Sequence, residues 1–167
     1  MEIGYRSWSL KFTKKGPRLG SIFSNGVWEP NEEGEVTSSW KAEEGIPFEE
    51  TTQGLYSLKL LKDVNELYAD AIRGSIIPIG KTAHGEHGYR SEKAKVKSLS
   101  IGITPCYICS KPAKYYVKDG ESFCLCEECF KRLKRLLKAK GHKGGNLDTV
   151  LRQLARIYDA EIEELDV

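Results

Sequence analysis

The sequence predicts an α+β protein with two parts: a β-rich, barrel-like domain with one helix over residues 1–100, and a smaller domain with two helices over residues 101–167. Three observations carry this prediction. Apolar residues alternate along much of the first hundred residues, which is the pattern of half-buried strands. All five cysteines lie between residues 106 and 129. Beyond the first of them, two segments place apolar residues at helical spacing. A chain of 167 residues is long enough to form a hydrophobic core in one or two small domains.

Composition indicates a globular chain without membrane spans. Hydrophobic residues make up 40% and charged residues 30% of the sequence, and the net charge is only +2, which excludes disorder and an overall commitment to nucleic acid. No apolar run approaches the roughly 20 residues that cross a bilayer, and the first ten residues lack the features of a signal peptide. We therefore expect a cytoplasmic protein with no membrane partner. Lys and Glu occur 18 times each, against two Gln and one Met, which is typical of thermophile proteins.

The N-terminal part is expected to consist mainly of short strands. Large side chains fall at every second position from Trp8 to Phe12, so residues 5–12 fit a half-buried strand. Further strands, bounded by Gly and Pro, are expected at residues 18–23, 35–42, 54–59, 75–81 and 91–100. Residues 60–72 differ, because their apolar side chains recur at the spacing of a helix. Together these elements fit a small barrel or curled sheet.

The tetrapeptide Gly-Tyr-Arg-Ser occurs twice, at residues 4–7 and 88–91. One interpretation is that two strands begin in the same way, with glycine as the turn residue. The other is functional: Tyr5 and Arg6 of the first copy line one surface with Tyr89 and Arg90 of the second. Both interpretations stay open on the sequence alone.

Four segments of this part carry a resemblance to a known domain. They are GYRSW near the start, VWEP, GLYSLK, and IPIGKTAHGEHGYRSE at the end. Together they resemble a small uncharacterised domain of phage, actinobacterial and archaeal proteins, over residues 4–100, although the Cys or His that members often carry between the second and third segments is missing. The resemblance implies a domain boundary near residue 100. Because that family has no assigned activity, it implies no mechanism.

An enzymatic function would depend on the segment from His84 to Arg90. His84 and His87 could share a metal ion, with Glu86 as a base. However, glycines interrupt the segment, which is typical of a hairpin connection whose polar side chains face water. We therefore favour a protein that is not an enzyme.

The cysteines predict one structural zinc ion per chain. Cys106 and Cys109 form one C-x2-C pair, Cys126 and Cys129 form a second, and 16 residues separate the pairs. Zinc takes four soft ligands in a tetrahedron, so two such turns complete a site and leave no position for a substrate. Cys124 is an alternative to Cys126, because the two share a face of an extended strand. We prefer Cys126, since its spacing to Cys129 repeats that of the first pair.

The segment around the cysteines resembles a treble-clef zinc finger over about residues 105–141. Residues 114–119 and 121–125 alternate around Asp119-Gly120, which predicts a β-hairpin, and a helix is expected over residues 127–140. A turn with two cysteines, a hairpin, and a helix that begins at the second pair is the order of that family. Modules of this family bind DNA, RNA, protein or none of these, so the resemblance does not decide the function.

The basic residues of the first C-terminal helix predict contact with nucleic acid. Its apolar stripe consists of Phe130, Leu133, Leu136 and Leu137. Opposite the stripe we expect Lys131, Lys134, Arg135 and Lys138 to bind the phosphates of DNA or RNA, with little sequence specificity. The alternative is that these cations only offset the negative charge of a four-thiolate zinc site.

The last helix is expected to begin near Asn146 or Asp148, either of which is a good N-cap. Its apolar stripe runs from Leu147 to Leu165. We expect it to pack on the preceding helix as an antiparallel hairpin, with its acidic end, residues 159–166, near the basic side chains. A protein adaptor without nucleic-acid binding, or a homodimer through this stripe, is the alternative to a nucleic-acid-binding protein.

Overall fold

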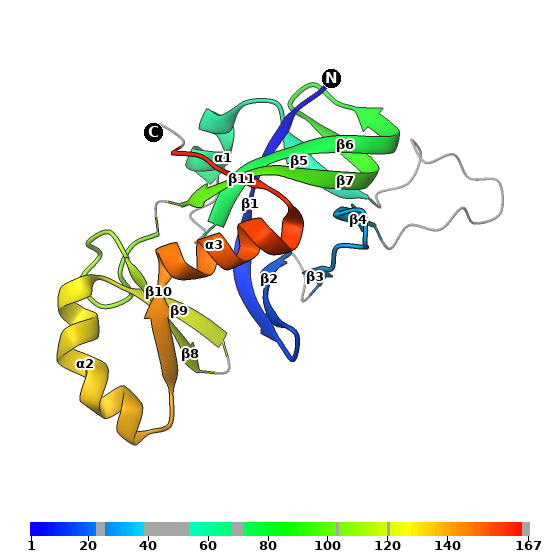
Figure 1. Ribbon diagram of the computed structural model, residues 1–167. Coiled ribbons are helices and arrows are strands. Elements are labelled where there is room, and N and C mark those ends of the chain that lie inside the picture. The colour runs from blue at the N-terminus through cyan, green and yellow to red at the C-terminus, as the bar shows by residue number, and fades with distance from the viewer. Residues whose placement is uncertain (23–25, 39–53, 68–71, 103, 120, 165–167) are drawn as a thin grey trace.

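The computed structural model describes residues 1–22, 26–38, 54–67, 72–102, 104–119 and 121–164. Within these ranges the fold is mixed and strand-rich, with two sheets (Figure 1). The N-terminal elements are β1 (Gly4–Thr13), β2 (Gly16–Gly20), β3 (Val27–Trp28), β4 (Glu35–Thr37), β5 (Leu55–Leu58), α1 (Leu61–Leu67), β6 (Ile72–His84) and β7 (Gly88–Ile101). The C-terminal elements are β8 (Tyr115–Asp119), β9 (Glu121–Leu125), α2 (Glu127–Ala139), β10 (Lys143–Asn146), α3 (Leu147–Tyr158) and β11 (Glu161–Ile162). No helix in the described ranges is long and apolar enough to cross a membrane.

The larger sheet is built around the long antiparallel hairpin of β6 and β7. β1 pairs with the start of β6, β5 pairs with the start of β7, and β1 meets β5 at Tyr5 and Leu58, so the pairings of four strands close a ring. The sheet continues beyond the ring, through β2 and β3 on one side and with β4 and β11 along β7. The strand-rich α+β class is therefore confirmed, whereas the sheet is not the clean barrel that the sequence suggested.

The main core lies between this sheet and α3. The apolar stripe of α3 is buried against side chains such as Leu19 of β2 and Leu99 of β7. The buried side chains of the helix are Leu147, Val150, Leu151, Leu154 and Tyr158. Among the described residues α3 packs on the sheet rather than on α2, so the expected hairpin of the last two helices is not observed. These five side chains of the stripe are therefore used inside the chain.

The last helix also ends earlier than its apolar pattern suggested. Asp159 has a φ of 51° in the left-handed region and closes the helix, and β11 then pairs in parallel with β7. Ile162 therefore lies half-exposed on a strand instead of continuing the helical stripe, and Leu165 lies outside the described residues. Because the helix ends at Asp159, the side chains beyond it follow the two-residue repeat of a strand and no longer the 3.6-residue repeat of a helix.

Most of the other N-terminal elements agree with the sequence pattern, although β2 ends at Gly20, before residue 23, and β3 was not expected. Two further elements differ. The helix expected over residues 60–72 is α1, which is described from Leu61 to Leu67, and Ile72 already pairs with Ile101 as the first residue of β6. The strand expected over residues 35–42 is observed as β4, which ends at Thr37; Ser38 follows it outside the strand, and residues 39–42 lie outside the described residues. The Glu-rich stretch at residues 43–50 lies there as well.

A hydroxyl group ties the C-terminal helix to the N-terminal sheet. The Oη of Tyr158 accepts a hydrogen bond from the Leu19 backbone N–H at 3.0 Å and donates one to the carbonyl of Trp28. We expect Tyr158→Phe to lower the free energy of unfolding by about 2 kcal/mol, because it leaves two buried backbone groups without a partner. Urea denaturation measures the loss, with Tyr107→Phe as a matched control at a ring that is 80% exposed. Equal stability of the two variants would contradict this role.

Candidate metal centre

The cysteines lie on a small unit formed by the second sheet and α2. β8 and β9 form the antiparallel hairpin that the sequence predicted, and β10 pairs with the other edge of β8. α2 follows β9 directly, as expected. Buried Val117 and Leu125 of the hairpin pack with the apolar side of α2 in a second core cluster, which also contains three of the cysteines. The hairpin and the helix thereby fix the two cysteine pairs relative to each other.

A tight turn presents the first pair. The Cys106 N–H donates to the carbonyl of Lys111 at 2.6 Å, and the Ser110 N–H donates back to the carbonyl of Cys106 at 3.0 Å. Ser110 takes the left-handed conformation, with a φ of 63°, that lets the chain reverse within this turn. The Tyr107 N–H donates to the carbonyl of Cys124, which anchors the turn to β9.

The second pair opens α2. Cys126 is the N-cap, with extended backbone (φ −69°, ψ 165°), and its Sγ accepts a hydrogen bond from the Cys129 N–H at 3.4 Å. The first helical bond follows, from the Phe130 N–H to the carbonyl of Cys126. Free N–H groups and the positive end of the helix dipole stabilise thiolates at this position.

The two pairs converge on one point. The Sγ atoms of Cys106, Cys109, Cys126 and Cys129 all lie within 4.8 Å of one another, and those of Cys109 and Cys126 are 3.6 Å apart. A zinc–sulfur bond of about 2.3 Å gives a tetrahedron whose edges are about 3.8 Å long. The spacing of the four thiols therefore suits a metal ion at their centre, and Cys109 alone of the four is exposed to solvent.

The local environment shifts the pKa values of two of the four thiols in opposite directions. Burial raises the pKa of Cys106, but hydrogen bonds from the backbone groups of Cys126, Cys109 and Ile108 outweigh it and bring that pKa to about 6. Burial and the neighbouring cysteine side chains raise the pKa of Cys129. One thiolate is thus present near neutral pH, whereas a cation must displace the proton of Cys129.

Cys124 does not join the group. Its side chain belongs to the main core cluster, and burial, together with the charge of Cys106, raises its pKa to about 11. The sequence left Cys124 and Cys126 as alternatives because both fit one face of an extended strand. β9 ends at Leu125, and Cys126 takes the N-cap position, so the two side chains diverge.

The four residues expected to bind phosphates lie along one side of α2, and we call Lys131, Lys134, Arg135 and Lys138 the basic face. All four are exposed. Lys131 forms an ion pair with Glu127 at 3.2 Å, one turn earlier. On the apolar side the ring of Phe130 stacks on that of Tyr115 with centroids 4.3 Å apart. Leu136, assigned to the apolar stripe by its spacing, is 52% exposed and lies outside the second core cluster.

The described part of the acidic end, residues 159–164, contacts the larger sheet and not the basic face that the sequence had suggested for it. Asp159 forms an ion pair with Lys95 of β7 at 3.3 Å, and Glu163 donates its backbone N–H to the carbonyl of Leu99. Both contacts lie on the larger sheet, on the far side of α3 from α2 (Figure 1). In the described part of the chain, the acidic groups that pair on the metal unit are Glu127 and Glu128.

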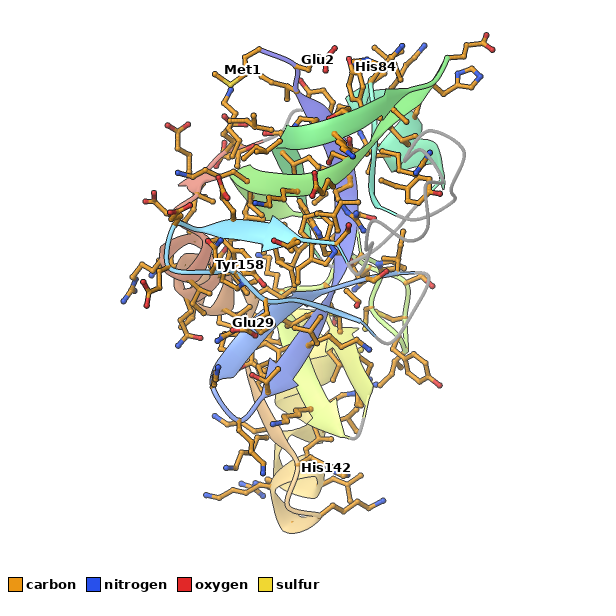
Figure 2. The ribbon with its side chains drawn as sticks, turned by 90° about the vertical axis from the view of Figure 1, so that its right-hand side faces the viewer. Met1, Glu2, Glu29, His84, His142 and Tyr158 are labelled. Carbon is orange, nitrogen blue, oxygen red and sulfur yellow. The ribbon has the colours of Figure 1, made fainter. Side chains whose placement is uncertain are left out.

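The His84–Arg90 segment spans the end of β6, the turn at residues 85–87 and the start of β7, as expected for a hairpin connection. His84 lies 3.3 Å from Glu2, whereas His87 lies 3.9 Å from its neighbour Glu86, and all four side chains are exposed. Figure 2 places His84 at one end of the molecule and His142, just beyond α2, at the other. Within the described ranges, the four cysteines form the one cluster of three or more metal-ligating side chains.

Sequence reasoning missed a cavity of about 1020 Å³ in the N-terminal part. Both copies of Gly-Tyr-Arg-Ser contribute to its wall, through Tyr5 and Arg6 of β1 and Tyr89 and Arg90 of β7. Each copy also begins a strand. The repeat therefore marks two strands that begin alike, and its Tyr and Arg residues line one surface. The repeat was the signal, but only the sheet pairing brings its copies side by side.

Neither a family model nor a curated protein nor a solved structure matches this chain. The resemblance of residues 4–100 to an uncharacterised domain therefore has no support from a family match, and function must be argued from the sites themselves.

Proposed function

We propose that the chain is a zinc-stabilised protein that binds nucleic acid through the basic face of α2. The observation that carries the proposal is an exposed row of cations on the metal unit. Lys134, Arg135 and Lys138 make no ion pair within the described residues, and Lys131 pairs with an exposed carboxylate of its own helix. Cations that only offset the charge of a thiolate centre would need to point toward it, whereas these four lie along the outside of the helix.

Zinc is the metal that the donor set favours. Four thiolates are soft ligands, and they complete a tetrahedron, so Cys106, Cys109, Cys126 and Cys129 would hold one structural ion with no open position. The order of turn, hairpin and helix supports assignment to the treble-clef type. Bound zinc would fix the start of α2 and thereby the direction of the basic face.

Two further exposed cations lie on the smaller sheet, on the face opposite to that of Val117, which packs toward α2. Lys143 of β10 is the cross-strand partner of Lys118 on β8, and both are exposed. The Nζ of Lys118 lies 5.1 Å from the ring centroid of Phe12, which holds the ammonium group at the junction of the two sheets. Two like charges facing each other cost stability in a sheet, so a polyanion that pairs with both would relieve this repulsion.

A protein adaptor is the second candidate, and one observation favours it. Tyr107 and Ile108, between the first two cysteines, are 80% and 48% exposed. Their position at the tip of the turn suits an apolar partner surface. The stripe of α3, the surface first considered for an adaptor, is buried.

Replacing the basic face with glutamine is expected to abolish nucleic-acid binding. The variant carries Lys131→Gln, Lys134→Gln, Arg135→Gln and Lys138→Gln, and α2 should persist because Gln is a good helix former. Anisotropy of a labelled 20-nucleotide strand or duplex, measured between 50 and 300 mM KCl, reports the affinity. For four phosphate contacts the parent protein should show a slope of about −3 to −4 in log K against log salt concentration.

A matched control removes the same charge elsewhere. Lys62→Gln, Lys81→Gln, Arg152→Gln and Arg156→Gln change four exposed cations on α1, β6 and α3, and this variant should keep the affinity within about twofold. No binding by the parent protein at 50 mM KCl, or equal losses in the two variants, would contradict the proposal. The exposed tip at Tyr107 would then be the first surface to test for a protein partner.

A further inference from the structure

The five cysteines of the chain differ in their access to solvent. Cys109 is exposed, whereas the other three ligands of the candidate site keep 5% of their surface or less in contact with water. Cys124, outside the group of four thiols, is buried as well. A reagent that arrives from solution therefore meets one sulfur of the metal unit first, and exposure of a thiolate is a main determinant of which cysteine is oxidised.

The turn of the first pair explains this exposure. Its tip consists of Tyr107 and Ile108, which are 80% and 48% exposed, followed by Cys109. A hydrogen bond from the Cys106 N–H to the carbonyl of Lys111 closes the base of the turn. Neither Ile108 nor Cys109 belongs to a core cluster. The tip therefore stands in solvent on a fixed base, and a small molecule can reach its sulfur.

A second sulfur lies beside the exposed one. The Sγ of Cys126 is 3.6 Å from that of Cys109. Cys126 is buried and fixed as the N-cap of α2, where its Sγ accepts a hydrogen bond from the Cys129 N–H at 3.4 Å. A disulfide bond is about 2.05 Å long, so the two sulfurs need to approach by roughly 1.5 Å. The exposed side of the pair can supply this shift, because no core packing holds the tip of the turn.

We propose that Cys109 and Cys126 form a disulfide when the protein meets hydrogen peroxide. Both sulfurs are thiolates when they serve as metal ligands. The Cys109 sulfur attacks one peroxide oxygen, the O–O bond breaks, and hydroxide leaves, which makes a sulfenic acid. The Cys126 sulfur then attacks this sulfur, and the S–O bond breaks with loss of a second hydroxide. Each cysteine loses one electron, the peroxide takes up both, and solvent protons convert the two hydroxides into water.

The disulfide disarms the metal unit. It removes two of the four donors, and Cys106 and Cys129 alone are fewer ligands than a structural zinc site uses. The N-cap of α2 also loses the negative charge that had stabilised the start of the helix. We therefore expect zinc release and loss of the helix that carries the basic face. Loss of nucleic-acid binding would follow, and that consequence rests on the function proposed above, whereas the disulfide and the zinc release depend on the metal centre alone.

The experiment exposes the full-length, zinc-loaded protein to 1 mM hydrogen peroxide at pH 7.5. A chromogenic chelator measures the released zinc, and two labels applied to samples taken during the release report the thiols. Iodoacetamide in denaturant marks the cysteines that stay reduced. After reduction, N-ethylmaleimide marks those that had formed the disulfide, and tandem mass spectrometry locates both labels. We expect release of one zinc ion per chain, the second label at Cys109 and Cys126, and the first label at the other three cysteines.

Two variants separate this role of Cys109 from a general sensitivity to peroxide, and each removes one thiol and leaves four. Cys109→His replaces the exposed sulfur by a nitrogen ligand that structural zinc sites also use. This variant should bind zinc and release it to peroxide at least about tenfold more slowly than the parent. Cys124→Ala removes a buried thiol outside the site and should release zinc at the parent's rate. Metal analysis and circular dichroism before oxidation verify loading and folding, and the labels on the parent protein decide the pairing even if the histidine variant does not load.

Three results would overturn the proposal: zinc that stays bound for one hour in peroxide, a second label at any pair other than Cys109 and Cys126, or equal release rates for a loaded Cys109→His variant and the parent. Fresh protein without zinc would overturn it together with the metal centre. Anisotropy before and after oxidation keeps this proposal apart from the function of the basic face. The expected disulfide in a protein that never bound nucleic acid would support the oxidation site and contradict the function proposed for the basic face.

Discussion

Removal of the metal is expected to unfold residues 105–141, including α2. The unit has a small core of its own, made by residues such as Val117 and Leu125 around three buried cysteines. Without a metal, the four thiols lose the bonds that hold the hairpin and the helix together. The apolar cluster that remains is too small to keep the two elements folded. The apparent free energy of zinc binding in comparable peptides is about 10–16 kcal/mol, which exceeds anything that this core supplies.

The measurement combines metal analysis with circular dichroism. Freshly reduced protein should contain about one zinc ion per chain, and a strong chelator should remove the ion together with the helical signal of α2. Binding should weaken as the pH falls from 8 to 5, because each thiol coordinates as a thiolate and burial raises the pKa of Cys129. Cys129→Ser should reproduce the effect of the chelator.

Cys124→Ala is the matched control for the ligand assignment. Cys124 lies in the main core, outside the group of four thiols, so the variant should keep its zinc and lose about 1 kcal/mol of stability or less. Loss of zinc in this variant would mean that Cys124 is a ligand. Protein without metal, or with iron in place of zinc, would contradict the assignment of a zinc centre.

Local patterns carried most of what the sequence predicted correctly. The spacing of the cysteines, the alternation around the tip of the β8–β9 hairpin and the N-cap at Asn146 each act over a few residues. Asn146 Oδ1 accepts a hydrogen bond from the Asp148 N–H at 2.8 Å, which settles where the last helix begins. Such signals depend on backbone sterics and nearby hydrogen bonds, and these are largely the same in any fold.

Non-local contacts account for what the sequence could not predict. The stripe of α3 is compatible with packing on a helix, on a sheet or on a second chain, and only the position of β7 and β2 decides between them. Ile162 falls in phase with the stripe, although Asp159 has already ended the helix. The cavity depends on β5 lying between the two repeat copies, a strand order that no local pattern encodes. The domain boundary expected near residue 100 also depends on non-local contacts, and it stays a prediction.

A chain that ends at residue 100 is expected not to fold cooperatively. The core cluster that contains Trp8 and Leu19 also contains five side chains of α3, and Tyr158 satisfies backbone groups of β2 and β3. Each of those five contributes about 1.5–3 kcal/mol when buried, or about 8–15 kcal/mol together. That total is as large as the whole stability of an ordinary domain, about 5–15 kcal/mol.

Thermal melts of the truncated and full-length chains test this expectation, and a substitution in the full-length chain tests it without truncation. Leu154 of α3 is fully buried, so Leu154→Ala should cost about 2–5 kcal/mol. Arg152→Ala, at an exposed position of the same helix, should cost less than about 0.5 kcal/mol. If Leu154→Ala destabilises only the metal unit, or if residues 1–100 melt cooperatively alone, the N-terminal sheet is an independent domain. If neither result occurs, α3 is part of the folding unit of that sheet, because its apolar stripe supplies part of the main core.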